Sequence, residues 1–291
     1  MTNIQTYSCE YENPSVGAIA GGAAVGMASK VLLNKSSGPI SRKILPQLLK
    51  AQEGISRNEY AQIRETIENY INKSGLKGKG VSILDANNRN LQAIKDAILK
   101  DCNKGLCKHL PEKLKKRVVD NAAQLAVDGK NAFYSFSSKQ LILPKKALGY
   151  AHFHELGHAI NANISSIGKF LQKSRHLALL ATPIFLIGLF KTKKAEGEKP
   201  KGAIDKTTNF IKENAGKLTF LAFMPLLIEE TMATIKGAKI AKKTMGANVA
   251  KKVLKTGAWG GASYLAVALL TTLGTTLAIK IKDAIAHRKQ V

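Results

Sequence analysis

The hydrophobic positions of this chain gather into long apolar runs separated by amphipathic segments. Four such runs stand out, at residues 16–33, 177–190, 218–228 and 257–281. Only the first and the fourth approach the roughly 20 residues that a helix needs to cross a bilayer. The two middle runs are shorter, which is typical of buried or re-entrant helices. The pattern predicts apolar helices that insert into a membrane, with a soluble helical core as the alternative.

The two middle runs are joined by a polar link, residues 191–217, that is rich in Lys and Gly. This arrangement predicts a helical hairpin over residues 177–228 with a solvated tip. The first run contains two GxxxG spacings, Gly17–Gly21 and Gly22–Gly26. Small residues at this spacing allow two helices to approach closely in lipid.

The segment before the second run is amphipathic and predicts three helices. A capping box at Ser56–Glu59 opens the first, which Gly75 ends. The second covers residues 90–100, and the third begins at Pro111. Apolar residues at helical spacing support the first and third helices: Ile63, Ile67, Tyr70 and Ile71 in the first, and Leu114, Val118, Ala122 and Leu125 in the third.

Three short β-branched or aromatic runs predict strands, at Val81–Leu84, Phe133–Phe136 and Leu141–Leu143. The last two flank the turn sequence SSKQ and predict a hairpin. The fold class expected from these patterns is mainly α with a small β-hairpin or sheet (α+β), combined with apolar, membrane-crossing helices.

Charge narrows the range of partners. The chain has 45 Lys and Arg against 20 Asp and Glu, a formal net charge of +25. Such an excess favours anionic partners, either nucleic acid or an acidic lipid surface. Aromatic residues make up only 6% of the chain and do not alternate with the basic residues, as a base-stacking surface requires. We therefore expect membrane lipid as a partner and no nucleic acid. The three cysteines form no disulfide framework.

The hairpin is followed directly by the chain's most informative motif, His154-Glu155-Leu156-Gly157-His158. Residues four apart on a helix point nearly the same way, so His154 and His158 can hold one metal ion. Glu155 lies beside that pair and can act as the general base for the attacking water. The motif predicts a zinc site, and its alternative is a surface helix that carries two histidines by chance.

Zinc with two histidines needs one more protein ligand, which must be distant in the sequence because no third histidine follows the motif at a suitable spacing. Glu229 and Glu230 are the best candidates, since they end an apolar helix and no other charge accounts for them. The alternative is that they only mark the polar boundary of that helix. Glu230 is preferred because Ala233 and Ala238 follow on neighbouring turns and permit close helix packing. His176 is a weaker candidate for a supporting role near the transition state.

The order of these segments resembles the membrane gluzincins related to HtpX and the CaaX prenyl proteases. The resembling features are Asn131-Ala132-Phe133, the hairpin, HELGHA, two apolar segments and a Glu-x-x-Ala, within residues 130–240. The resemblance implies a minimal zincin core with zinc held by His154, His158 and Glu230. It also implies that an extended polypeptide binds along the strand of Asn131, Ala132, Phe133 and Tyr134.

One departure from that family bears on the site. The family has Asp directly after the Ala of Glu-x-x-Ala, where it orients a ligand histidine, and this chain has Thr234. A hydroxyl can accept a hydrogen bond from an imidazole but supplies no charge, so ligand orientation and metal affinity are expected to be weaker. The expected organisation is an N-terminal apolar segment, a helical region, a metallopeptidase core and a C-terminal apolar helix with a basic tail, at residues 1–33, 34–129, 130–256 and 257–291.

These observations predict a zinc-dependent, membrane-associated endopeptidase that crosses the membrane more than once. Residues 34–175 carry 25 Lys and Arg, so the positive-inside rule predicts a catalytic side in the cytoplasm. The link 191–217 carries eight Lys against four acidic residues, which conflicts with that orientation. The alternatives are a catalytically degraded membrane scaffold or pseudoprotease, and a soluble, basic nucleic-acid binder.

Overall fold

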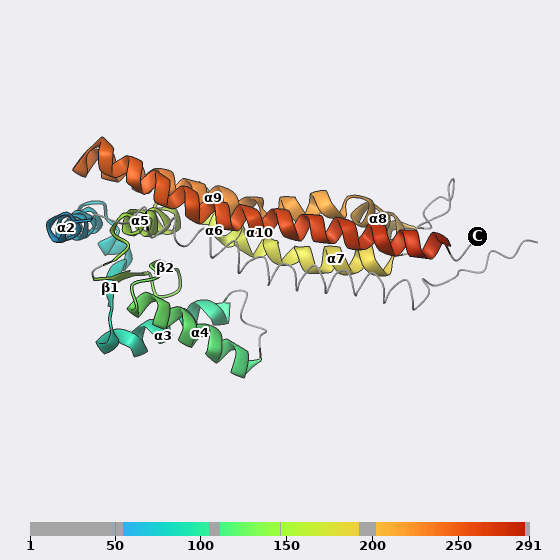
Figure 1. The fold of residues 1–291 in the computed structure, drawn as a ribbon, viewed down its shortest axis with the longest axis horizontal. Helices are drawn as coiled ribbons and strands as arrows, with labels where there is room; N and C mark the ends of the chain where they lie inside the picture. The colour runs from blue at the N-terminus through green and yellow to red at the C-terminus, as the bar shows by residue number, and fades with distance from the viewer. Residues whose placement is uncertain (1–49, 51–54, 105–110, 146, 192–201, 289–291) are drawn as a thin grey trace, which may run out of the picture. The chain divides into compact units, whose positions relative to one another are not determined.

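The computed structural model describes Lys50 and residues 55–104, 111–145, 147–191 and 202–288. The described chain is mostly helical and contains one small sheet, as the hydrophobic pattern predicts (Figure 1). The first apolar run, 16–33, lies outside the described residues. The elements in chain order are α2 Arg57–Lys73, η1 Lys77–Lys79, β1 Ser82–Ala86, η2 Asn88–Asn90, α3 Leu91–Lys104, α4 Glu112–Val127, β2 Phe133–Ser135, β3 Gln140–Pro144, α5 Gly149–Asn163, α6 Ser166–Ser174, η4 Arg175–Leu180, α7 Ala181–Phe190, α8 Ala203–Glu213, α9 Ala215–Met245 and α10 Ala247–Arg288.

The chain divides into two compact units. The site unit comprises Ser36–Leu179 and Ala222–Val267 and carries the sheet and α5. The helical unit comprises Leu180–Leu221 and the chain from Ala268 onwards. The long helices α9 and α10 contribute residues to both units.

The first predicted helix begins and ends where its capping signals place it. The Ser56 side chain accepts a hydrogen bond from the Glu59 backbone N–H at 3.0 Å, so α2 is capped at its first turn. Gly75 adopts φ +77°, a left-handed conformation that terminates the helix just beyond Lys73. The predicted apolar face is buried, through Ile63, Ile67 and Ile71.

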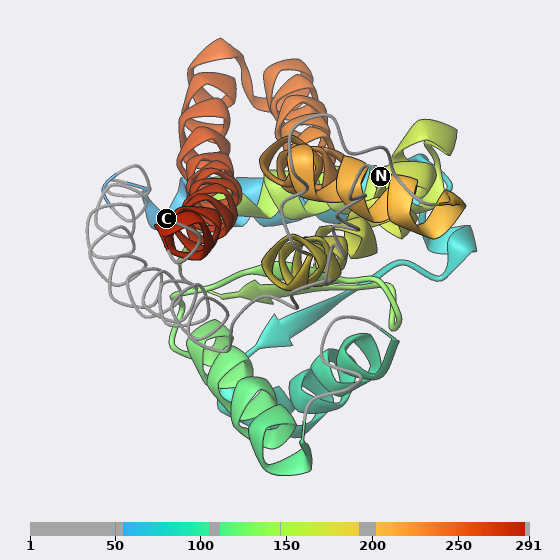
Figure 2. The same ribbon diagram turned by 90° about the vertical axis from the view of Figure 1, so that its right-hand side faces the viewer.

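The predicted hairpin of β2 and β3 is present. The remaining predicted strand, β1, pairs with β3 to make a three-stranded sheet in the order β1-β3-β2. β2 and β3 pair antiparallel, whereas β1 and β3 pair parallel. On the central strand, Leu141 and Leu143 pack into the core with α2 and α5, and Ile142 packs into the core with α3 and α4. Helices therefore cover both faces of the sheet (Figures 1 and 2).

The face of α4 that packs against α3 differs from the predicted one. Leu114, Val118 and Leu125 are exposed, while the neighbouring face is buried through Val119, Ala123 and Ala126 together with Lys115. Ala123 and Ala126 are fully buried, and their small side chains let the two helices pack closely. The apolar stripe alone could not distinguish the two faces, because apolar residues continue from one to the other.

The packing of α5 against α9 places the two halves of the predicted site together. A Cβ added at Gly157 would lie 2.0 Å from the Ala233 carbonyl oxygen, and one added at Gly237 would lie 2.2 Å from the Phe153 carbonyl oxygen. These glycines permit a backbone approach that no larger residue allows. The expectation that small residues bring this helix close to the HELGH helix is thus met, since Ala233 is fully buried at the crossing.

The link between the middle apolar runs is not wholly irregular, because α8 occupies Ala203–Glu213. Lys212 on α8 is buried and lies 2.9 Å from the Asp283 carboxylate on α10. Burial lowers the pKa of Lys212 to about 8. This contact is within the helical unit and explains why part of a polar link folds against apolar helices.

Among the described residues, three helices are long and apolar enough to cross a membrane: Ser166–Phe190, Ala215–Met245 and Ala247–Ile285. The two middle apolar runs are shorter than the helices that contain them, so their lengths wrongly indicated helices too short to cross a membrane. The second run is preceded by more helix, and the third continues through Glu229 and Glu230 to Met245. Both carboxylates are buried and paired, so they do not end the helix as their charge suggested.

Candidate metal centre

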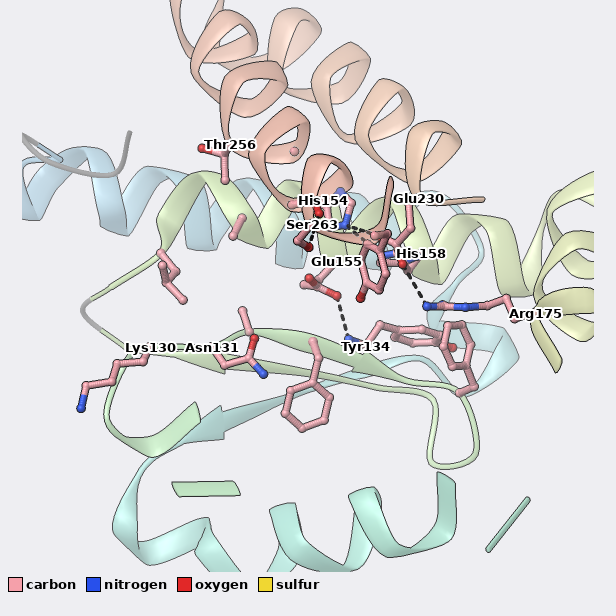
Figure 3. A pocket seen from close by; sticks show the side chains of 18 residues that line it. Lys130, Asn131, Tyr134, His154, Glu155, His158, Arg175, Glu230, Thr256 and Ser263 are labelled. Carbon is pink, nitrogen blue, oxygen red and sulfur yellow. Dashed lines mark hydrogen bonds and ion pairs between the residues drawn. The ribbon is translucent and has the colours of Figure 1, made fainter. Parts of the chain in front are cut away.

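The two motif histidines lie one turn apart on α5, a helix buried on most of its surface. Their Nε2 atoms are 3.0 Å apart. The Glu230 Oε2 atom, from α9, lies 3.3 Å from the His154 Nε2 atom and 3.5 Å from the His158 Nε2 atom. The three side chains converge from two helices (Figure 3), and together they could hold a metal ion.

The second nitrogen of each histidine has its own partner. The His154 Nδ1 atom lies 2.9 Å from the Thr234 hydroxyl, which itself donates to the Glu230 carbonyl oxygen. The His158 Nδ1 atom lies 2.9 Å from the Glu229 carboxylate. These partners accept a hydrogen from Nδ1 in both rings, which leaves each Nε2 free to bind a metal. Thr234 therefore contacts His154, as its position in the motif suggested.

Glu229, the open alternative for third ligand, lies behind His158 rather than beside Glu230. It is fully buried and meets the Nδ1 side of the ring, away from the Nε2 atoms that converge with Glu230. Burial lowers the pKa of His158, but the Glu230 and Glu229 carboxylates outweigh burial and raise it well above its usual value.

Arg175 completes the centre, and sequence reasoning missed it. Its Nη2 atom lies 2.9 Å from Glu230 Oε1 and its Nη1 atom lies 3.3 Å from Glu229 Oε2. The guanidinium also lies 5.6 Å from the centre of the Phe136 ring. The only sequence signal was a single arginine directly before an apolar run, and such an arginine is also common at the end of a membrane-crossing helix.

The other histidines near the motif lie outside the centre. His176 is exposed on η4 and does not line the cleft described below, so the supporting role expected for it is not met. Its neighbour Arg175 points into the site instead (Figure 3). His152 is fully buried against Tyr60, whose hydroxyl lies 3.4 Å from its Nε2 atom. Burial lowers the pKa of His152 to about 3, so it stays neutral within the core.

Glu155 joins the metal centre to the sheet. Its Oε2 atom accepts a hydrogen bond from the backbone N–H of Tyr134 on β2 at 2.8 Å. The side chain is almost buried, and desolvation raises the pKa of its carboxyl group. Figure 3 shows it between the histidines and the strand.

A cleft of about 290 Å³ opens onto these groups. One side is formed by the four residues predicted to bind substrate, and the opposite side by a face of α10 that is rich in small residues and includes one tyrosine. His154, Glu155, His158, Arg175 and Glu230 also line it. The residues on the two sides are Asn131, Ala132, Phe133 and Tyr134 on the first, and Thr256, Gly257, Gly260, Ser263 and Tyr264 on the second.

The contribution of α10 had no signal in the sequence beyond an apolar run with several glycines. A Cβ added at Gly260 would meet nothing within 4 Å, so the space before this residue belongs to the cleft. By contrast, a Cβ at Gly257 would lie 2.3 Å from the Thr234 side chain. One glycine therefore keeps the cleft open, and the other lets α10 pack against the residue that contacts His154.

No family model, curated protein or solved structure matches this chain. The resemblance of HELGH and Glu-x-x-Ala to the membrane gluzincins therefore stays a prediction from short motifs. What the chain can do must be argued from the geometry of its own residues.

Proposed function

We propose that this chain is a zinc-dependent endopeptidase in which His154, His158 and Glu230 hold the metal. The observation that carries the proposal is the spacing of the three donor atoms, which are 3.0, 3.3 and 3.5 Å apart. Two donors at about 2.0–2.2 Å from one tetrahedral zinc ion lie about 3.3 Å apart. The three atoms are thus spaced as three donors to one tetrahedral zinc ion would be, and the residues that carry them line the cleft.

The donor set also suits zinc chemically. Two imidazoles and one carboxylate are typical of catalytic zinc sites, which keep a position open for water. Both ligand rings are held by hydrogen bonds at Nδ1, so neither must reorient to bind. When bound there, zinc would supply a Lewis acid that lowers the pKa of a water molecule towards neutrality.

Glu155 is the residue proposed to transfer protons during the reaction. Its carboxylate would take a proton from the attacking water and later pass it to the leaving amine. Burial raises its pKa above the usual range, and a base works best when its pKa lies nearer the working pH. The hydrogen bond from the Tyr134 N–H to Oε2 holds the side chain in place.

The edge of β2 supports an extended polypeptide as substrate. β2 pairs with β3 on one side, and no further strand lies beside it in the part of the chain that the structure describes. The Tyr134 N–H points away from β3, towards Glu155. Ala132 directly precedes β2 and lines the same cleft as Tyr134. A peptide that pairs along this edge, beside the hydrogen bond between Tyr134 and Glu155, would pass the metal centre.

We further propose that the protein crosses the membrane more than once. The support is that three helices in the described part of the chain are long and apolar enough to span. One of them, α10, also forms a side of the cleft. Residues 34–175 carry 25 Lys and Arg and residues 236–256 carry seven. This bias favours a catalytic side in the cytoplasm.

Membrane insertion predicts resistance to alkaline extraction. After a carbonate wash at about pH 11, immunoblotting should find the protein in the membrane pellet, because hydrophobic burial in lipid does not depend on charge. A peripheral protein held only by its net charge of +25 would be released by the same wash or by high salt. Release under either condition would contradict the membrane-spanning assignment.

The metal assignment predicts about one zinc per purified chain, measured by elemental analysis. His158→Ala should reduce this to a small fraction, because only two of the three ligands remain. His176→Ala is the matched control, since this histidine is exposed and does not line the cleft. It should leave the zinc content unchanged.

Zinc content measured together with a cleavage assay separates the proposal from its main alternative. A degraded membrane scaffold or pseudoprotease would come out metal-free, or would bind zinc without cleaving any polypeptide. Equal zinc in wild type, His158→Ala and His176→Ala would mean that the metal binds elsewhere and would remove the basis of the proposed site.

A further inference from the structure

Glu229 is fully buried, yet it receives four hydrogen bonds or ion pairs. Its Oε1 atom lies 2.9 Å from His158 Nδ1, 2.9 Å from Asn161 Nδ2 and 3.0 Å from Gln172 Nε2. Its Oε2 atom lies 3.3 Å from Arg175 Nη1. An amide at this position would turn its NH2 group towards other donors, either the Arg175 guanidinium or the donors around Oε1. The surroundings therefore require a carboxylate.

The location of Glu229 rules out a role as a marker of the helix end. The helix α9 continues from this position to Met245. It also rules out direct ligation alongside Glu230, because Glu229 contacts His158 at Nδ1 and the metal side of that ring is Nε2. A carboxylate on the far nitrogen of a ligand histidine fixes the ring and increases its basicity as a ligand.

We propose that Glu229 is the positioning residue that orients and polarises His158 as a metal ligand, an inference that rests on the proposed zinc site. In the resembling family, Asp at the position of Thr234 orients a ligand histidine. Here Thr234 contacts His154 without charge, and Glu229 supplies the charge at the other ligand histidine. The carboxylate therefore pairs with His158 and the hydroxyl with His154.

The surrounding residues fit this role. Asn161 is fully buried and holds the Glu229 carboxylate through its amide, while its own oxygen accepts from Lys236 at 2.6 Å. Gln172 bonds both the Glu229 carboxylate and the His158 carbonyl oxygen. These contacts fix the carboxylate relative to the histidine it serves.

Charge balance accounts for Arg175. Glu229 and Glu230 are adjacent buried carboxylates that the guanidinium bridges. With a divalent ion and the Glu155 carboxylate added, the formal charges of these groups cancel. Arg175 therefore allows a second buried carboxylate behind the ligands without leaving a net charge in a low-dielectric setting.

The test is zinc affinity of the full-length protein in detergent, measured by competition with a chromophoric chelator. Glu229→Gln should weaken zinc binding about 10–100-fold, the usual effect of removing such a partner. Glu68→Gln is the matched control, because it makes the same change at a side chain that is 52% exposed. It should leave the affinity within about twofold of wild type.

A second substitution distinguishes positioning from a general structural effect. Thr234→Asp placed on the Glu229→Gln background restores a carboxylate–histidine pair, now at His154. This double variant should recover most of the lost affinity. A role for Glu229 in packing alone predicts no recovery, because the Thr234 hydroxyl bonds to His154 and to the Glu230 carbonyl oxygen, away from the packing that Glu229 provides.

Glu229→Asp keeps the experiment decisive if the amide variant does not fold. It retains the charge among the same donors, but its carboxylate ends one methylene short of His158, so zinc binding should weaken as well. Wild-type affinity in both single variants, or no recovery in the double variant, would overturn the positioning role while leaving the site intact. Equal zinc binding in wild type and His158→Ala would instead overturn the proposed site and this inference with it.

Discussion

Glu155→Gln should abolish peptide hydrolysis while leaving zinc bound. The amide oxygen can still accept the hydrogen bond from the Tyr134 N–H, so the strand and helix stay joined. The amide cannot take a proton from water, and a positioned general base contributes about 10²–10⁴-fold to such reactions. We expect cleavage of a fluorescent casein substrate, and of the protein's own chain, to fall by about 10²-fold or more.

The zinc content of the same sample shows whether the loss of cleavage comes from the base or from the metal ligands. Lost cleavage with about one zinc per chain assigns the loss to the base, whereas lost cleavage with lost zinc assigns it to the ligands. Glu68→Gln, remote from the cleft and exposed, controls for removal of one negative charge. Unchanged cleavage in Glu155→Gln would remove this residue from the proposed role.

The secondary structure could largely be predicted from sequence because its signals are local. Ser56 and Gly75 mark the ends of α2, and both act through the backbone within a few residues. The hairpin before α5 likewise follows from two short runs and their turn. The parallel pairing of β1 with β3 could not be predicted, because it depends on contacts about 60 residues apart.

Charges inside apolar helices were the main source of error. Glu229 and Glu230 suggested a helix end, because a carboxylate in an apolar setting is costly unless it is paired. Their partner, Arg175, lies more than 50 residues earlier in the chain. The pairing that makes these charges tolerable is a tertiary property, so the length of α9 could not be read from its hydropathy.

In the candidate site too, local patterns could be predicted and tertiary contacts could not. His154, Glu155 and His158 could be singled out because their spacing on one helix already implies convergence. Glu230 could be preferred over Glu229 because small residues on the following turns indicated a close helix crossing. The roles of Arg175 and Glu229 could not be predicted, because each depends on the direction of a side chain from another helix.

Gly157→Ala should destabilise the site unit strongly, although alanine is the better helix former. In an unobstructed helix this change stabilises by up to about 1 kcal/mol. At Gly157 the new Cβ would lie 2.0 Å from the carbonyl oxygen of Ala233 and 2.8 Å from its Cα atom. These are backbone atoms of α9, so the overlap can be relieved only by moving one helix away from the other. Overpacking of this kind costs about 1–3 kcal/mol, and occasionally more.

The movement should also be visible in the metal site, because Glu230 lies one turn before Ala233 on α9. Gly157→Ala should therefore lower both the thermal unfolding midpoint and the zinc affinity. Gly261→Ala is the matched control, a glycine of α10 whose added Cβ would meet nothing within 4 Å. It should be neutral or slightly stabilising, since only helix propensity changes there. If Gly157→Ala unfolds at the same temperature as Gly261→Ala and binds zinc as tightly, α5 and α9 do not cross as closely as the proposed ligand set requires.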